Sequence, residues 1–126
     1  MKVYQALFLF FLLPLANAKA NKSAIVFLIA EREYQTDETL PVFAKENLGG
    51  KYIIKYCKAE KEGSDRHVLK NAGAIAEADL LFVSVRRRAF SDKTMSLIRK
   101  HVSDGKPVLG IRTASHAFSL RKESLP

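Results

Sequence analysis

The sequence contains a single cysteine, Cys57, among 126 residues. No internal disulfide can therefore form. Cys57 lies in an apolar pattern typical of a strand, which favours a buried, unreactive thiol over a reactive one. Beyond residue 15 the sequence also lacks any apolar run long enough to span a membrane. It has no internal repeats and no low-complexity segments, and its length is enough for one domain.

Residues 1–18 have the three parts of a signal peptide. Met1-Lys2 is a short basic start, the run from Ala6 to Leu15 is apolar apart from Pro14, and residues 16–18 (Ala-Asn-Ala) form a small-x-small cleavage site. A membrane anchor is the alternative, but this apolar run is shorter than the ~20 residues that a span needs. We expect cleavage after Ala18, export to the periplasm or the extracellular space, and no stable membrane anchor afterwards.

The chain is basic, with 21 Lys and Arg residues against 13 Asp and Glu residues and a formal net charge of +8. This excess indicates anionic partners, such as a phosphorylated or carboxylated ligand, an acidic polysaccharide or a membrane surface. Nucleic acid is a common partner of basic chains, but export and the lack of aromatic residues interleaved with basic ones argue against it. We expect a small polar or anionic ligand, with sugars among the candidates. The oligomeric state is not indicated.

Strand patterns alternate with helical patterns along the chain. Apolar runs predict strands at 23–30, 51–57, 79–85 and 108–111, the second nearer a sheet edge because it partly alternates. Helical patterns lie between them. The order predicts an α/β, flavodoxin-like fold, a three-layer α/β/α sandwich with a parallel sheet. Strand 1 is expected between strands 2 and 3, with strand 4 beyond strand 3 and an exposed edge beside it.

The helix ends and faces can also be predicted. Thr36 or Thr39 could cap the first helix, which ends at the Gly49-Gly50 pair. Ser91 is expected to cap the helix before the fourth strand, with the apolar side chains of Met95, Ile98 and Val102 on its buried face. Asp79, at the start of a strand, is expected to cap its local turn.

Three polar segments each follow an apolar strand: residues 31–35, 86–88 and 112–116. Because the carboxyl ends of parallel strands share one edge of the sheet, these segments are expected to meet at the switch point between strands 1 and 3. The third follows a turn, Asp104 to Pro107, and a short apolar run. That pattern predicts a buried strand, a tight turn and the start of a helix, whose N–H groups face the ligand space.

Several roles are open for the side chains at this edge. The run Arg86-Arg87-Arg88 is either a guanidinium clamp on an anionic or polyhydroxyl ligand, or a set of solvated arginines pairing with Glu31 and Glu33. Glu33 could act as a base, bind sugar hydroxyls or form a salt bridge.

His116 could be an acid–base group, a metal ligand or a packed helix residue. His67 and His101 fall away from this edge, so neither a metal cluster nor a cofactor is predicted. Ser115 is a candidate nucleophile, although the pattern Gly-x-Ser-x-Gly is absent and a histidine rarely reaches the hydroxyl of its own sequence neighbour.

The segment Val108-Leu-Gly-Ile-Arg-Thr-Ala-Ser-His-Ala-Phe118 resembles the elbow of ThuA-like (trehalose-utilisation) domains, in the class I glutamine amidotransferase-like superfamily. The superfamily pattern is Gly-x-Cys-x-Gly-x-Gln. Gly110 matches the first glycine, and Arg112, Ala114 and His116 fall on the cysteine, the second glycine and the glutamine. Glu-x-Tyr-x-Thr (Glu31 or Glu33 with Tyr34) and Ser-Val-Arg-Arg-Arg at 84–88 also resemble this family. The resemblance covers roughly residues 24–120.

The resemblance implies an exported domain that binds, or binds and acts on, a carbohydrate or related polar metabolite, without glutaminase activity because the nucleophile is absent. The implied site comprises His116 as the catalytic candidate and, as ligand-binding residues, Glu33, Tyr34, Arg86, Arg87, Arg112, Thr113 and Ser115. The alternatives are a non-catalytic binding or scaffold module, a truncated remnant, and, less favoured, a hydrolase. Because superfamily members usually carry further strands and a later acid–histidine segment, residues 19–126 are expected to be the N-terminal part of a ThuA-like domain, incomplete at the C-terminus.

Overall fold

Four apolar segments form one parallel sheet in the computed structural model, which describes residues 21–121. The strands are β1 (Ala24–Ala30), β2 (Ile53–Lys58), β3 (Leu80–Val85) and β4 (Val108–Gly110). Their order is β2-β1-β3-β4, and all three pairings are parallel. The predicted α/β, flavodoxin-like fold is therefore confirmed, including the central place of the first strand and the edge position of the second.

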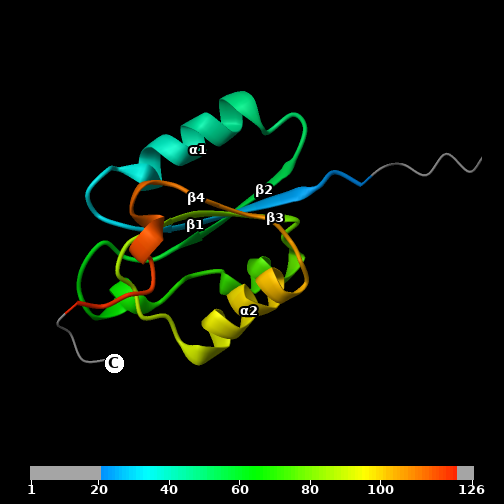
Figure 1. Ribbon diagram of the computed structural model, residues 1–126. Coiled ribbons are helices and arrows are strands. Elements are labelled where there is room, and N and C mark those ends of the chain that lie inside the picture. Colours follow the sequence, from blue (N-terminus) through cyan, green and yellow to red (C-terminus); the bar gives the residue numbers. More distant parts are fainter. Residues whose placement is uncertain (1–20, 122–126) are drawn as a thin grey trace, which may run out of the picture.

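Helices cover both faces of this sheet (Figure 1). One face carries α1 (Thr36–Asn47), and the other carries α2 (Asp92–Ser103) with the 3₁₀ turn η2 (Ala72–Glu77). All seven residues of β1 are buried because this strand lies between the two layers, which explains its unbroken apolar sequence. Two shorter 3₁₀ turns, η1 (Ser64–His67) and η3 (Arg112–His116), follow β2 and β4.

The start of α1 differs from the predicted threonine cap. The N-cap residue is Gln35, in the left-handed region with φ of 51°, and its side chain makes no cap hydrogen bond. The hydroxyl of Thr36 instead donates to Glu31, back at the end of β1. Within the helix, Pro41 has no N–H for the carbonyl of Asp37, and Lys58 Nζ donates to that carbonyl at 2.9 Å.

The N-terminal cap of α2 is confirmed, and its buried face is the predicted one for Ile98 and the partly buried Met95, but not for Val102. Ser91 accepts a hydrogen bond from the backbone N–H of Thr94 at 3.4 Å. The buried residues of α2 are Thr94, Ile98 and His101, whereas Val102 is 57% exposed. His101 can be buried because its Nε2 bonds to the carbonyl oxygen of Pro107 at 3.0 Å.

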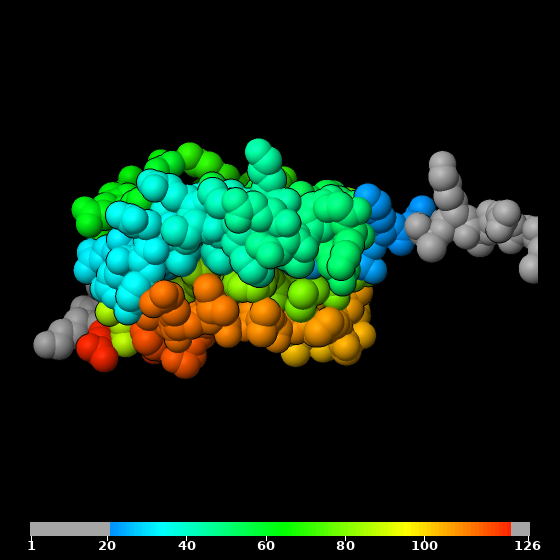
Figure 2. All heavy atoms as spheres, turned by 90° about the horizontal axis from the view of Figure 1, so that it is seen from above, coloured from blue at the N-terminus to red at the C-terminus, as the bar shows by residue number. Residues whose placement is uncertain are grey.

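Strand β4 is exposed, contrary to the prediction of a buried strand. Val108 and Leu109 are each 47% exposed, because β4 lies at the end of the sheet and α1 covers only part of the neighbouring face. Figure 2 shows β4, in orange, uncovered beside α1. An apolar groove of about 430 Å³ lies on this side, with Phe43, Leu80 and Phe82 among its lining residues. The predicted exposed edge beside the fourth strand is present.

Two polar groups near β1 take defined structural roles. Cys57 is fully buried, as predicted, and its Sγ lies 3.1 Å from the carbonyl oxygen of Asn71. Burial raises the pKa of this thiol to about 11, which lowers its reactivity further. Asp79 does not cap its own turn, because its Oδ2 accepts a hydrogen bond from the backbone N–H of Ala24 at 2.7 Å. It thus holds the start of β1 against the start of β3.

The predicted signal peptide, residues 1–18, lies outside the described residues. Across residues 21–121, no helix has both the length and the apolar character needed to cross a membrane.

Candidate functional site

Three loops meet at the carboxyl edge of the sheet, one after each of β1, β3 and β4. Glu33 and Arg86 form an ion pair that joins the first loop to the second. The guanidinium of Arg112 lies 4.4 Å from the centre of the Tyr34 ring, which joins the first loop to the third. The structure thus brings together the predicted side chains of Glu33, Tyr34, Arg86, Arg112 and His116, hereafter the edge cluster.

Glu31 holds the first of these loops in shape. Its carboxylate accepts hydrogen bonds from the backbone N–H groups of Glu33 (2.8 Å) and Tyr34 (3.2 Å), and from the hydroxyl of Thr36 (2.7 Å). The Thr36 hydroxyl in turn accepts from Ser84 of β3 at 3.1 Å. Because Glu31 is only 4% exposed, its part is to fix the loop that carries Glu33 and Tyr34.

Left-handed backbone conformations gather at this edge. Four non-glycine residues among those described have positive φ, and Gln35, Arg87 and Arg112 lie one in each of the three loops. Such conformations cost about 1–3 kcal/mol each and are concentrated at functional sites. The fourth, Asn71, lies elsewhere, after η1. This distribution favours the carboxyl edge as the functional part of the molecule.

The turn after β4 is tight, as the sequence pattern predicts, but it continues as the 3₁₀ turn η3. A Cβ placed on Gly110 would lie 2.9 Å from the Cβ of Ala114, so glycine is needed where the strand meets the turn. Thr113 donates its hydroxyl to the carbonyl of Val85 at 3.3 Å. This predicted ligand-binding residue therefore ties the turn to the end of β3.

Backbone contacts place His116 beside the arginine run. The N–H of Arg87 donates to the carbonyl of His116 at 3.3 Å, and the Arg87 side chain donates to the carbonyl of Ser119 at 3.0 Å. Partial desolvation lowers the pKa of His116, and the nearby charges of Arg87 and Arg86 lower it further. The imidazole is therefore neutral at pH 7 and can accept or donate one hydrogen bond to a ligand.

Ser115 and His116 are closer than the sequence suggests. The Ser115 hydroxyl lies 3.2 Å from His116 Nδ1, although neighbouring residues were expected not to meet in this way. The short turn η3 allows the contact, and Ser115 is exposed. Among residues 21–121, however, no carboxylate is hydrogen-bonded to His116, so the contact lacks the third group that orients a catalytic histidine.

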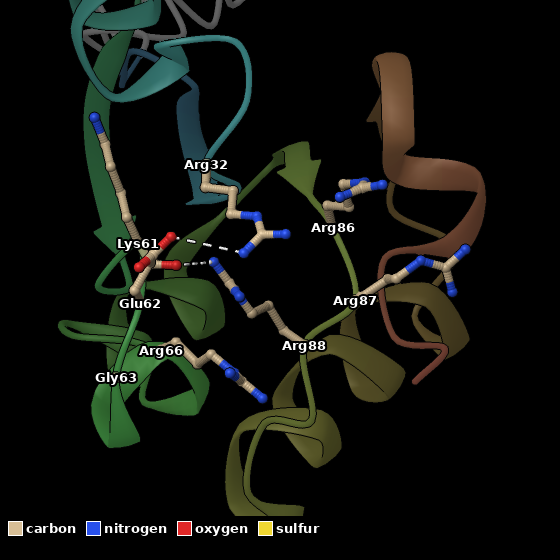
Figure 3. Close-up of a pocket in the computed structure, with 8 residues that line it drawn as sticks. All are labelled: Arg32, Lys61, Glu62, Gly63, Arg66, Arg86, Arg87 and Arg88. Atoms are coloured by element: carbon tan, nitrogen blue, oxygen red, sulfur yellow. Dashed lines mark hydrogen bonds and ion pairs between the residues drawn. The ribbon is translucent and has the colours of Figure 1, made fainter. Parts of the chain in front are cut away.

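A second polar site lies on the same edge, and the sequence predicted only its arginine run, residues 86–88. A pocket of about 220 Å³ lies between the loops after β1, β2 and β3 (Figure 3). We call it the arginine pocket, lined by Arg32, Lys61, Glu62, Gly63, Arg66, Arg86, Arg87 and Arg88. The charged run after β2 looks like a solvated loop in the sequence. Because β2 is parallel to β1, its carboxyl end also lies at this edge of the sheet. The charged run after β2 could therefore have been grouped with the other three loops from the sequence.

The described residues contain no group of three or more His, Cys, Asp or Glu side chains that could hold a metal ion. No family model, no curated protein and no solved structure matches this chain.

Proposed function

We propose that this chain is an exported ThuA-like domain that binds a carbohydrate or a related polar metabolite through the edge cluster. The observation that carries the proposal is that two guanidinium groups from different loops contact adjacent residues of a third loop: Arg86 is held by Glu33, and Arg112 lies over Tyr34. Arginine forks bind carboxylates and hydroxyl groups at fixed geometry, so a polar ligand would be oriented as well as attracted.

Each side chain of the edge cluster has a matching role toward such a ligand. Arg86 and Arg112 would donate hydrogen bonds to hydroxyl or carboxylate oxygens, and Glu33 would accept from sugar hydroxyls. Tyr34 would offer its ring edge and hydroxyl. The neutral imidazole of His116 would accept or donate one further bond. Glutaminase chemistry is not part of the proposal, because Arg112 stands at the nucleophile position and Cys57 is buried in β2.

Binding without catalysis is the form of the proposal that this geometry supports best. A hydrolase remains the second candidate because Ser115 and His116 are in contact at 3.2 Å. The two differ in a simple measurement. Hydrolysis requires Ser115, so a Ser115→Ala variant would lose any esterase activity, whereas binding through the arginines would persist in that variant.

Replacing Arg112 by alanine is expected to weaken ligand binding about tenfold or more, because one charge-assisted hydrogen bond to a ligand contributes about 1.5–3 kcal/mol. The measurement is calorimetric titration of the chain with trehalose as a neutral probe and gluconate as an anionic probe. Arg99→Ala is the matched control, since Arg99 is exposed on α2 and its loss changes the net charge equally. Equal weakening by Arg112→Ala and Arg99→Ala, or no binding of either probe at millimolar concentration, would contradict the proposal.

A further inference from the structure

The arginine pocket concentrates positive charge between three loops. Its lining includes five arginines, one lysine and one carboxylate. The charged groups of Arg86, Arg87 and Lys61 contact other parts of the chain, so three guanidinium groups and one carboxylate remain at the pocket. Its volume of about 220 Å³ is several times the share of one water molecule in the liquid, about 30 Å³. A small oxyanion fits this space together with a few waters.

The guanidinium groups in the pocket come from different parts of the chain. Figure 3 shows the ends of Arg32 and Arg88 approaching each other between the loops after β1 and β3. Arg66, from the segment after β2, extends below them, and its Nε donates to His67 Nε2 at 3.0 Å. The side chains of Arg86 and Arg87 point away from it. They contact Glu33 and the carbonyl of Ser119 on the other side. The arginine pocket and the edge cluster are therefore two sites that share the segment 86–88.

Buried contacts fix the frame of the pocket. Arg88 is only 5% exposed, and its Nη2 donates to the backbone carbonyls of Glu60 (3.4 Å) and Lys61 (3.1 Å). It thereby holds the loop after β2 against the loop after β3, which makes Arg88 a positioning residue. Lys61 pairs with Asp37 at 3.1 Å, and its side chain points away from the pocket (Figure 3).

The acidic side chain in the lining forms a loose contact. Glu62 lies 3.6 Å from Arg32, and the two side chains are 75% and 57% exposed. An exposed pair of this kind is weak, so the Arg32 guanidinium is readily given up to another anion. The carboxylate of Glu62 therefore occupies the guanidinium that an external oxyanion would use, as a weak internal competitor.

We propose that the arginine pocket binds a tetrahedral dianion, inorganic phosphate or the phosphate group of a monoester. Arg32 supplies the fork of donors, the charge of Arg88 lies beside it, and the charge of Arg66, from a third loop, adds to the attraction. Phosphate is favoured over a monocarboxylate because it carries more charge and accepts hydrogen bonds on several sides at once. This site goes beyond the proposed carbohydrate site and does not depend on it.

Calorimetric titration of the chain with inorganic phosphate and, separately, with methyl phosphate tests this assignment. Arg32→Ala is expected to weaken binding about tenfold or more, and Glu62→Gln to strengthen it several-fold, because the competing carboxylate is removed. Arg99→Ala, with the same loss of charge on α2, is expected to change affinity less than about twofold. Binding of both probes indicates a site for monoesters, and binding of inorganic phosphate alone indicates a site for the free ion. Either result supports the proposal.

The proposal is overturned if neither probe binds at millimolar concentration, if Arg32→Ala and Arg99→Ala weaken binding equally, or if Glu62→Gln weakens it. The variant Arg112→Ala tests whether the arginine pocket and the edge cluster bind independently. It is expected to leave phosphate binding unchanged while it weakens gluconate binding, so the two sites can fail separately. Because Arg32 and Glu62 are mostly exposed, both variants are expected to fold.

Discussion

Replacing Glu31 by alanine is expected to lower the free energy of unfolding by about 3 kcal/mol. The carboxylate is buried and accepts hydrogen bonds from two partly buried loop N–H groups and from the buried hydroxyl of Thr36. Removing it leaves these donors without an acceptor, and each buried unsatisfied group costs about 1–3 kcal/mol. Urea unfolding followed by circular dichroism measures the change.

The control for Glu31→Ala is the same substitution two residues later. Glu33 is partly exposed and pairs with Arg86, so Glu33→Ala is expected to cost less than about 1 kcal/mol. The Glu31 variant is also expected to bind gluconate more weakly although Glu31 cannot touch a ligand, because the loop carrying Tyr34 loses its anchor. Equal destabilisation by the two substitutions would contradict the role assigned to Glu31.

Replacing Phe27 by alanine is expected to lower the free energy of unfolding by about 3–5 kcal/mol, the usual cost of deleting a buried aromatic ring. Phe27 is fully buried under α1. Its ring stacks on that of Phe82 with centroids 4.7 Å apart, and lies 5.6 Å from that of Tyr56. It therefore joins the three strands β2, β1 and β3 on one face of the sheet. Chemical unfolding monitored by circular dichroism gives the difference.

Phe43→Ala removes the same ring from a position on α1 that is 44% exposed. It is expected to cost less than about 1.5 kcal/mol, because much of the ring already contacts water. Domains of this size have a free energy of unfolding of about 5–15 kcal/mol, so Phe27→Ala removes a large part of the stability. Phe27→Leu leaves a smaller cavity and stays folded, so its free energy of unfolding can be compared with that of Phe43→Ala. A larger loss for Phe43→Ala than for Phe27→Leu would contradict the central place of Phe27 in the core under α1.

The sheet could be predicted from the sequence because apolar runs and charged loops alternate so clearly. The unbroken run of β1 required burial on both faces, which fixed its central place. The same rule failed for β4, because an apolar run of three or four residues does not distinguish a covered strand from an exposed edge strand. On α2, hydrophobicity favours Val102 over His101 for the core. Only the carbonyl of Pro107, supplied by a later turn, makes burial of the histidine favourable.

The sequence predicted the location of the candidate site better than its individual contacts. Strand direction brings the loops after β1, β3 and β4 to one edge, so the grouping of Glu33, Arg86 and Arg112 follows from topology. The structural use of the Thr113 hydroxyl depends on the exact turn after β4 and carries no sequence signal. The arginine pocket was missed because a run of mixed charges after a strand is also typical of a solvated loop.

Titration of the His116 ring by NMR, with and without gluconate, tests the central claim most directly. Desolvation, together with the charges of Arg87, Arg86 and Arg121, lowers the pKa of His116, so protonation of the ring is disfavoured in the folded chain. An anion bound in the edge cluster favours the protonated ring, so the pKa is expected to rise on binding and the affinity for gluconate to increase as the pH falls below 7. A His116 pKa that stays unchanged while gluconate binds would place the ligand elsewhere and contradict the account.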